Sequence, residues 1–343
     1  MQIEKKNNFK NDIIIIDGLW GTGKSMLSPI ISSMDRVENV KIEHIYEYTS
    51  HLNSLGKISD DAAIWILRNY ADLSQYNNSI GREINLRWSD DSGFKNNPNK
   101  LKYIKRLFQG EGDKKIEEID SKNLALCIMS HMILLSQKLL KNAFGDRLNI
   151  IEVMRHPLYM VNHWKNSFDR FDSSRNFTPS FFYNNIKVPW FADSWKEDFI
   201  NYDNLEKSII SICKLYPLLE EKIKIAKNQD IKVLQITFEN IIFDTGNSMQ
   251  IIEEFIGRSH SKKLKKILRN QKIPRKNITQ GRGHSNYGWK SDNKSDYEVY
   301  KNQINYIKNN CSTKIFTNMI DIIKWYEKKY PSKLSFMNQY LAK

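Results

Sequence analysis

A glycine-rich segment near the start of the chain combines the residue types and the spacing of a phosphate-binding loop. Residues 18–25 read GLWGTGKS, which fits the pattern G-x-x-x-x-G-K-[ST]. Glycines allow backbone N–H groups to converge on phosphate oxygens, and the N-terminus of a following helix adds positive potential. Lys24 would add a point charge, and the Ser25 hydroxyl could bind a phosphate oxygen or a magnesium ion. The segment predicts that a phosphorylated nucleotide is bound by Gly18, Gly21, Thr22, Gly23, Lys24 and Ser25.

Arg155 is a second candidate for binding the same ligand. It follows residues 149–154, which read NIIEVM and have the composition of a buried strand. An arginine at the carboxyl end of a strand lies where open α/β sheets bind ligands. We therefore expect Arg155 to lie near the glycine-rich loop, although a surface arginine before a helix would have the same pattern.

Positive charge is concentrated in one part of the chain. The sequence has 53 Lys and Arg against 39 Asp and Glu, and the segment from Arg258 to Ser291 contains eleven of the basic residues and no acid. A local surplus indicates one anionic partner at one place. Arg282 and Lys290, in a loop with Gly and Trp, could close over a phosphate. A solvated helix face or an acidic polysaccharide would also account for the charge, whereas no nucleic-acid-binding motif is visible.

Composition excludes several other classes of protein. The three cysteines are far apart without a CxxC pair, and the seven histidines form no HExxH motif, so we predict no metal site and no disulfide framework. The apolar runs are far shorter than the ~18 residues of a membrane span. The four isoleucines at 13–16 are too few for the core of a signal peptide. We expect a soluble cytoplasmic protein.

Strand-like and helix-like segments alternate along the 343 residues. This alternation predicts an α/β fold, a three-layer sandwich with a central, mainly parallel sheet. The expected strands are 12–17, 40–46, 149–154 and 231–237. The expected helices are 24–34, 60–76, 121–142, 157–168, 204–227, 249–256, 262–269, 296–309 and 316–329. Segments 82–99 and 172–195 are expected to be loops.

The order of these stretches resembles the sulfotransferases that use 3′-phosphoadenosine 5′-phosphosulfate (PAPS) as donor. Residues 18–27, GLWGTGKSML, are similar to the family's 5′-phosphosulfate loop, G-L-P-R-S-G-T-T-x-L. The family's basic residue is absent at Gly21, and Lys24 stands where a Thr is usual, so this loop is closer to that of an NTPase. The resemblance implies a P-loop kinase-like fold, here one domain over 1–343 with helical insertions.

The remaining matches concern the 3′-phosphate of the donor. Arg155 and Pro157 match the family's Arg-x-Pro, but His163 stands where the family has a Ser. Residues 233–240, VLQITFEN, resemble the family's strand and Tyr-Glu-Asp turn, and Arg282 and Gly283 resemble its C-terminal Arg-Lys-Gly loop. The resemblance therefore implies that Arg155, His163, Arg282 and Gly283 bind the 3′-phosphate.

The resemblance also implies transfer of a sulfuryl group to a hydroxyl of a carbohydrate or small molecule. Lys24 would stabilise the oxygens of the transferred and leaving groups. Cytosolic members of the family have a catalytic His upstream of the anchoring Arg, and His131 is the matching candidate base. Other members use Glu, so Glu83 is the rival candidate. A structural histidine and a surface glutamate are the plainer alternatives.

The acceptor is expected to bind in the segments that have no match to the family, the insertions 50–125 and 170–230. The net charge of +14 would suit an acidic carbohydrate. Two other functions fit the loop. One is a magnesium-dependent kinase with ATP, since both Lys24 and Ser25 of an NTPase loop are present. The other is a non-catalytic nucleotide binder.

Overall fold

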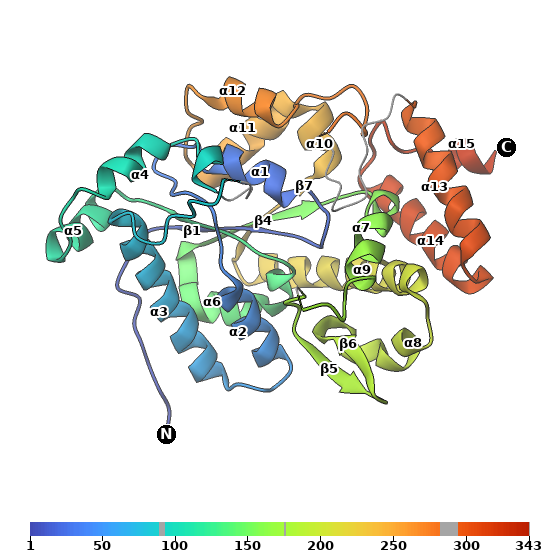
Figure 1. The fold of residues 1–343 in the computed structure, drawn as a ribbon, viewed down its shortest axis with the longest axis horizontal. Coiled ribbons are helices and arrows are strands. Elements are labelled where there is room, and N and C mark those ends of the chain that lie inside the picture. The colour runs from blue at the N-terminus through green and yellow to red at the C-terminus, as the bar shows by residue number, and fades with distance from the viewer. Residues whose placement is uncertain (89–92, 175, 282–293, 343) are drawn as a thin grey trace.

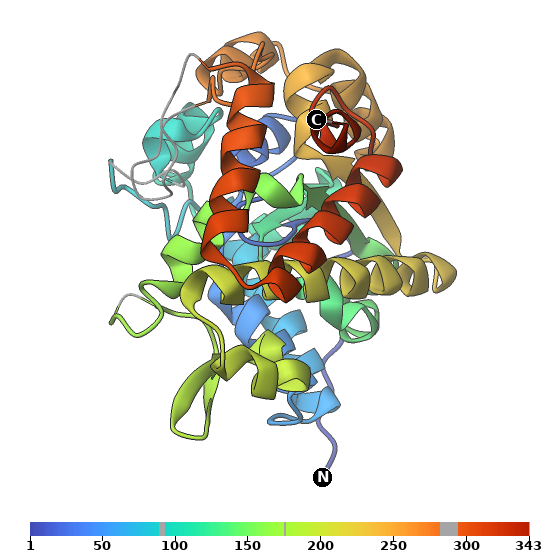
Figure 2. The same ribbon diagram turned by 90° about the vertical axis from the view of Figure 1, so that its right-hand side faces the viewer.

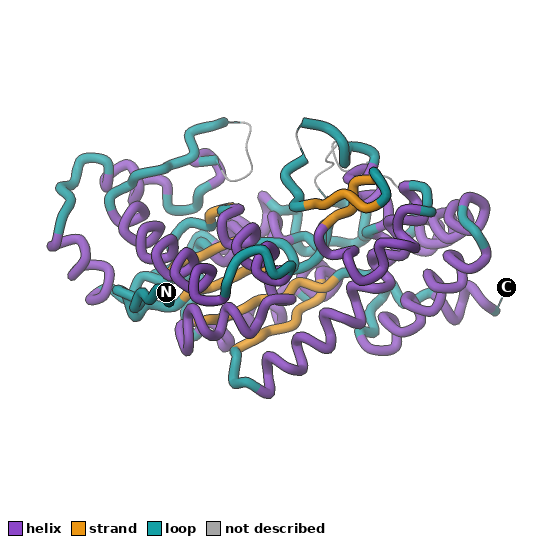
Figure 3. Tube along the Cα trace, turned by 90° about the horizontal axis from the view of Figure 1, so that it is seen from below, coloured by secondary structure: helices purple, strands orange, loops and turns teal. Residues whose placement is uncertain are grey.

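A five-stranded sheet, in which every strand pair is parallel, forms the centre of the fold (Figure 1). The strands lie in the order β2 (Lys41–Ile42), β3 (Leu126–Met129), β1 (Ile13–Asp17), β4 (Leu148–Met154) and β7 (Lys232–Thr237). Helices cover both faces of the sheet, which confirms the predicted three-layer α/β class (Figure 3). The computed structural model describes residues 1–88, 93–174, 176–281 and 294–342.

The four isoleucines of β1 explain why this strand lies at the centre. Successive side chains of a strand point to opposite faces, so a strand covered on both faces is apolar throughout. Ile14 and Ile16 pack in the core on the side of α1, and Ile13 and Ile15 pack in the core on the opposite side. The helices on the first side are α1 (Lys24–Ile31), α10 (Phe238–Phe243) and α11 (Thr245–Ile256), and those on the second are α3 (Asp60–Ser79), α6 (Gln137–Phe144) and the C-terminal part of α9 (Asn204–Asn228).

The remaining elements surround this sandwich. The helices α13 (Asp296–Asn310) and α14 (Thr313–Lys329) lie together at one end, where α14 packs on α9 (Figure 2). A two-stranded hairpin, β5 (Ser180–Tyr183) with β6 (Ile186–Pro189), is separate from the main sheet. The other helices are α2 (His44–Ser54), α4 (Lys100–Arg106), α5 (Asp113–Ser121), α7 (Val161–Phe168), α8 (Lys196–Ile200), α12 (Leu264–Asn270) and α15 (Met337–Leu341).

The strand order places three chain segments at one edge of the sheet. The strand order reverses at β1, because β3 lies on one side of β1 and β4 lies on the other. The carboxyl ends of parallel strands meet at one edge, and ligands bind in the crevice where the strand order reverses. The segments that begin there are the glycine-rich loop after β1, Ser130 and His131 after β3, and Arg155 after β4.

Three sequence expectations about the fold were wrong. Residues 121–142 do not form one helix: they contain β3, a short 3-10 helix and the start of α6. The run LCIM is fully buried in the sheet, and a short apolar run has no periodicity that separates a strand from a buried helix. The strand expected at 40–46 is only Lys41–Ile42, because α2 begins at His44. The expected loop 172–195 contains the β5–β6 hairpin.

In the part of the chain that the structure describes, no helix has both the length and the apolar character needed to cross a bilayer.

Candidate functional site

The glycine-rich loop joins β1 to α1 and depends on glycine at two positions. Gly18 has φ of 147°, and a Cβ there would lie 2.5 Å from the carbonyl oxygen of Val153. Gly23 has φ of 97°, and a Cβ there would lie 2.4 Å from the ring of Phe238. Positive φ and this close approach together exclude larger residues. The loop therefore has the tight backbone path that the sequence pattern predicts.

Lys24 is the cation at the centre of the loop. Its buried Nζ donates hydrogen bonds to the carbonyl oxygens of Gly18 and Leu19, both at 2.7 Å. Burial lowers the pKa of Lys24 to about 8, against the opposing effect of Asp17 and Glu152. A lysine held in this way can lose its present partners to an arriving phosphate and regain a higher pKa beside its charge.

Two fully buried carboxyl groups lie next to Lys24. Asp17 and Glu152 are paired in register on β1 and β4. Asp17 accepts hydrogen bonds from Ser130 Oγ at 3.0 Å and from the Leu134 N–H at 2.8 Å. Neither oxygen of Glu152 has a hydrogen-bond partner among the described residues. Burial raises the pKa of both groups, and for Glu152 the charge of Asp17 adds to the effect.

Two guanidinium groups converge on the ring of Phe238, beside the loop. The Cζ of Arg155 lies 4.3 Å from the ring centroid, and the Cζ of Arg275 lies 5.4 Å from it. Arg155 Nη1 also donates to the Gly21 carbonyl oxygen at 2.6 Å. Burial lowers the pKa of Arg275 to about 10, and the like charge of Arg155 contributes. Two cations held close together beside the glycine-rich loop could attract a negatively charged group.

His163 lies against the loop, on α7. A Cβ placed on Gly21 would lie 3.0 Å from Cγ of the imidazole. Burial, together with the charges of Arg155 and Lys24, lowers the pKa of His163 to about 3. The ring is therefore neutral near pH 7, and a neutral imidazole can donate one hydrogen bond. The structure thus brings His163, Arg155 and the loop together, as the sequence predicts.

His131 lies two residues after the end of β3 and is held by a carboxylate. Its Nδ1 lies 2.8 Å from Oε1 of Glu47, a nearly buried residue of α2. Although burial opposes it, the charge and hydrogen bond of His131 hold the pKa of Glu47 well below its usual range. His44 Nδ1 lies 3.6 Å from the other oxygen of Glu47. A carboxylate bonded to Nδ1 fixes the proton on that nitrogen and leaves Nε2 as an acceptor.

Glu83 has a different setting. Its half-exposed carboxylate accepts hydrogen bonds from Lys41 Nζ at 3.1 Å and from Asn77 Nδ2 at 2.9 Å. These partners lie at β2 and α3 rather than in the glycine-rich loop. Arg282 and Gly283, the other residues expected at the 3′-phosphate, lie outside the described residues, as does Lys290.

Three residues of the site were not selected as site residues from the sequence. Arg275 is one of eleven basic residues in its segment, and nothing in the local pattern distinguishes it from the others. Phe238 was noted within a family-like stretch, but its contact with two arginines depends on the tertiary structure. Glu47 is 84 residues from His131, and a lone acid on a helix gives no signal for such a pair.

Comparison with known proteins gives structural neighbours only. No protein-family model matches the sequence, and no curated protein is similar to it. A sulfotransferase domain from the curacin biosynthetic pathway is similar in structure, with a TM-score of 0.40 and 8% identity over 92% of this chain and 98% of that one. A sulfotransferase domain from the Synechococcus PCC 7002 olefin synthase has a TM-score of 0.40 and 12% identity over 95% of this chain and 97% of that one.

Proposed function

We propose that the protein transfers a sulfuryl group from PAPS to an acceptor hydroxyl. The observation that carries the proposal is the pair Arg155 and Arg275 on Phe238, beside the glycine-rich loop. A nucleotide with one phosphate chain needs only the loop. A nucleotide with phosphates at both the 5′ and the 3′ positions needs a second cationic site close to it, and the arginine pair supplies one.

The loop and Lys24 would act on the 5′ end of the donor. The acceptor oxygen forms a bond to sulfur while the bond from sulfur to the 5′-phosphate oxygen breaks, which leaves a 3′,5′-bisphosphate and a sulfated acceptor. Lys24 would leave the Gly18 and Leu19 carbonyls and stabilise the negative charge on the departing oxygen. Backbone N–H groups of the loop would hold the phosphate in place.

His131 would take the acceptor proton. With Nδ1 bonded to Glu47, Nε2 has the free electron pair that a general base requires. As the imidazole becomes charged, the Glu47 carboxylate stabilises it. Glu83 is less suited to this role, because its carboxylate already holds Lys41 and Asn77.

The kinase alternative has one observation in its favour. Ser25 is exposed at the start of α1, directly after Lys24, where an NTPase loop presents a hydroxyl to magnesium. The acidic groups nearest to Lys24, Asp17 and Glu152, are fully buried, and Asp17 already accepts two hydrogen bonds. This setting favours the sulfotransferase over the kinase.

Calorimetry with two nucleotides tests the proposal. We expect 3′-phosphoadenosine 5′-phosphate to bind at least about tenfold more tightly than adenosine 5′-monophosphate, a difference of about 1.4 kcal/mol for the added phosphate. Arg275→Ala should remove most of that difference and leave binding of the monophosphate nearly unchanged. Arg269→Ala, which removes an exposed arginine of α12 in the same basic segment, is the matched control.

The nucleotide affinities distinguish the sulfotransferase from the kinase and from a nucleotide binder without catalysis. Equal affinity for the two nucleotides would count against the sulfotransferase, and tighter binding of ATP with magnesium than of the bisphosphate would select the kinase. Tight bisphosphate binding without sulfation of any acceptor in a broad panel would leave a nucleotide binder.

A further inference from the structure

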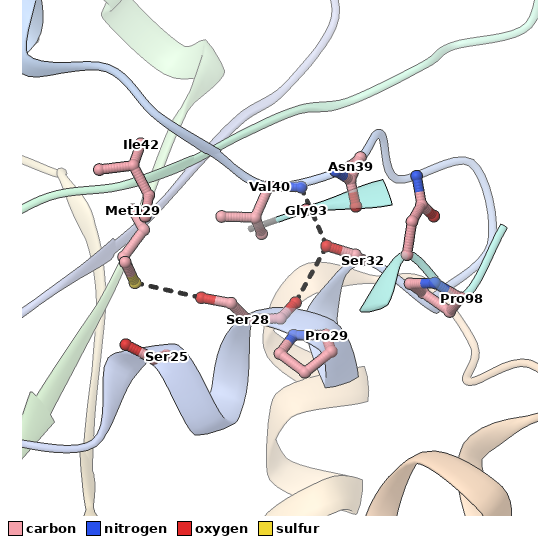
Figure 4. Close-up of a pocket in the computed structure, with 11 residues that line it drawn as sticks. Ser25, Ser28, Pro29, Ser32, Asn39, Val40, Ile42, Gly93, Pro98 and Met129 are labelled. Atoms are coloured by element: carbon pink, nitrogen blue, oxygen red, sulfur yellow. Dashed lines mark hydrogen bonds between the residues drawn. The ribbon is translucent and has the colours of Figure 1, made fainter. Parts of the chain in front are cut away.

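A narrow pocket lies directly beside the glycine-rich loop. It has a volume of about 50 Å³ and lies between α1, the ends of β2 and β3, and the segment 93–98 (Figure 4). Ser28 Oγ donates to Met129 Sδ at 3.3 Å, and Ser32 Oγ accepts from the Val40 N–H at 3.0 Å. With these serine hydroxyls engaged, the wall is mainly apolar, and we call it the inner pocket.

The inner pocket ends at residues of the proposed reaction site. Ser25 and Ser28 extend from α1 on the side of Met129 (Figure 4). Ser25 follows Lys24 in the loop, and Met129 is the last residue of β3, two positions before His131. The inner pocket is therefore lined by one residue of the glycine-rich loop and by the last residue of β3.

A second, larger pocket adjoins the first. Both are lined by Asn39, Val40, Ile42 and Asn97, so they share a boundary. This outer pocket has a volume of about 140 Å³ and is lined also by the aromatic side chains Phe94 and Tyr103. The Asn78 amide is buried, and its Nδ2 has no hydrogen-bond partner among the described residues.

The charges of the outer pocket balance one another. Its charged lining residues are Lys41, Arg82, Glu43 and Glu83. Lys41 Nζ lies 3.1 Å from Glu83 and 3.7 Å from Glu43. Arg82 forms an ion pair at 3.0 Å with Glu111. The outer pocket offers many donors and acceptors but no surplus of positive charge, which favours a neutral partner over the acidic carbohydrate that the net charge suggests.

We infer that the two pockets form the acceptor site, and that the acceptor is a neutral, hydroxyl-rich molecule that carries its reacting hydroxyl on a slim apolar segment. The apolar segment enters the inner pocket and brings the hydroxyl to Lys24 and His131. The hydroxyl-rich body occupies the outer pocket, whose charges balance. This inference rests on the proposed function, since it takes the loop as the place of sulfuryl transfer.

Binding of a defined probe tests the inference without turnover. The probe is 4-hydroxyphenyl β-D-glucopyranoside, a phenol with a neutral sugar, titrated by calorimetry into the protein saturated with 3′-phosphoadenosine 5′-phosphate. Its counterpart is 4-hydroxyphenyl β-D-glucuronide, which adds one negative charge. We expect the glucoside to bind and the glucuronide to bind at least about tenfold more weakly.

Matched variants locate the binding. Ile42→Trp fills the boundary between the pockets and should weaken glucoside binding at least about tenfold. Ile251→Trp is the control, because Ile42 and Ile251 are both 37% exposed and Ile251 lies on α11.

Any of three other results would overturn the inference about the acceptor site. It fails if the glucoside does not bind, if the glucuronide binds as tightly, or if Ile42→Trp and Ile251→Trp behave alike. Failure of the proposed function has a different signature: the bisphosphate would not bind, while the glucoside would still bind to the nucleotide-free protein and remain sensitive to Ile42→Trp.

Discussion

His131 and Glu47 are joined by a hydrogen bond of 2.8 Å between Nδ1 and Oε1, although 84 residues separate them in the chain. His131 lies two residues after β3, and Glu47 is on α2, so the pair forms only when α2 packs near the segment that follows β3, where it contacts the short 3-10 helix at Ile133–Ser136. Glu47 is nearly buried, which shields the bond from solvent. In the proposed function, the carboxylate would act on the acceptor through the histidine, as a positioning residue.

Removing either partner of this pair should lower kcat and preserve nucleotide binding. We expect His131→Ala to lower kcat for sulfation by about 10²–10⁴, the usual contribution of a general base. Glu47→Gln should lower kcat by less and should abolish the preference for the Nδ1–H tautomer, which ¹⁵N chemical shifts of His131 report. An unchanged tautomer in Glu47→Gln would exclude the positioning role.

Nucleotide binding should weaken as the pH rises above about 8. The pKa of Lys24 is lowered to about 8 in the free protein, and a bound phosphate should raise it again. Above pH 8 binding must therefore take up a proton, and affinity should fall by up to about tenfold per pH unit. Calorimetry in two buffers of different ionisation enthalpy measures this uptake. The nucleotide affinity of Lys24→Arg should not change with pH in this range. A wild-type affinity that is equally independent of pH would contradict the assignment of the titration to Lys24.

Glu152→Gln should stabilise the protein at pH 8. Burial raises the pKa of Glu152 above its ordinary 4.5, so the folded chain retains a proton that the unfolded chain has lost. Stability attributable to this group falls as pH rises from the unfolded towards the folded pKa. Replacing the Glu152 carboxyl group by an amide, which does not titrate, should raise the melting temperature by about 2–4 °C at pH 8, and by less at pH 5. A larger gain at pH 5 than at pH 8 would reverse the assigned sign.

Gly18→Ala should abolish nucleotide binding and lower stability. At φ of 147° the new Cβ would lie 2.5 Å from the Val153 carbonyl oxygen, so the loop must move. We expect a loss of at least about 1–3 kcal/mol, the usual range for such backbone strain. Gly246→Ala, in α11 with open space around the position, should be neutral or slightly stabilising. Denaturant unfolding and calorimetry compare the two variants.

The local sequence pattern was sufficient to predict part of this candidate site. The loop, β1, β4 and Arg155 were predictable, because the glycine spacing and the apolar runs are local consequences of the backbone geometry they adopt. The strand β3 was missed, since LCIM is too short to show a period, and His131 was therefore expected within a helix. The positions of Arg275 and Glu47 in the site could not be predicted from the sequence, because they depend on contacts between distant segments.

The two carbonyl oxygens that hold Lys24 have a consequence for selectivity among anions. A chloride ion offers one contact and would have to displace two hydrogen bonds of 2.7 Å within the loop. A phosphate group offers several oxygens to the ammonium and to the backbone at once. In the ligand-free loop, the carbonyl oxygens of Gly18 and Leu19 thus already occupy the ammonium group of Lys24. Chloride should therefore compete poorly with phosphate for this group.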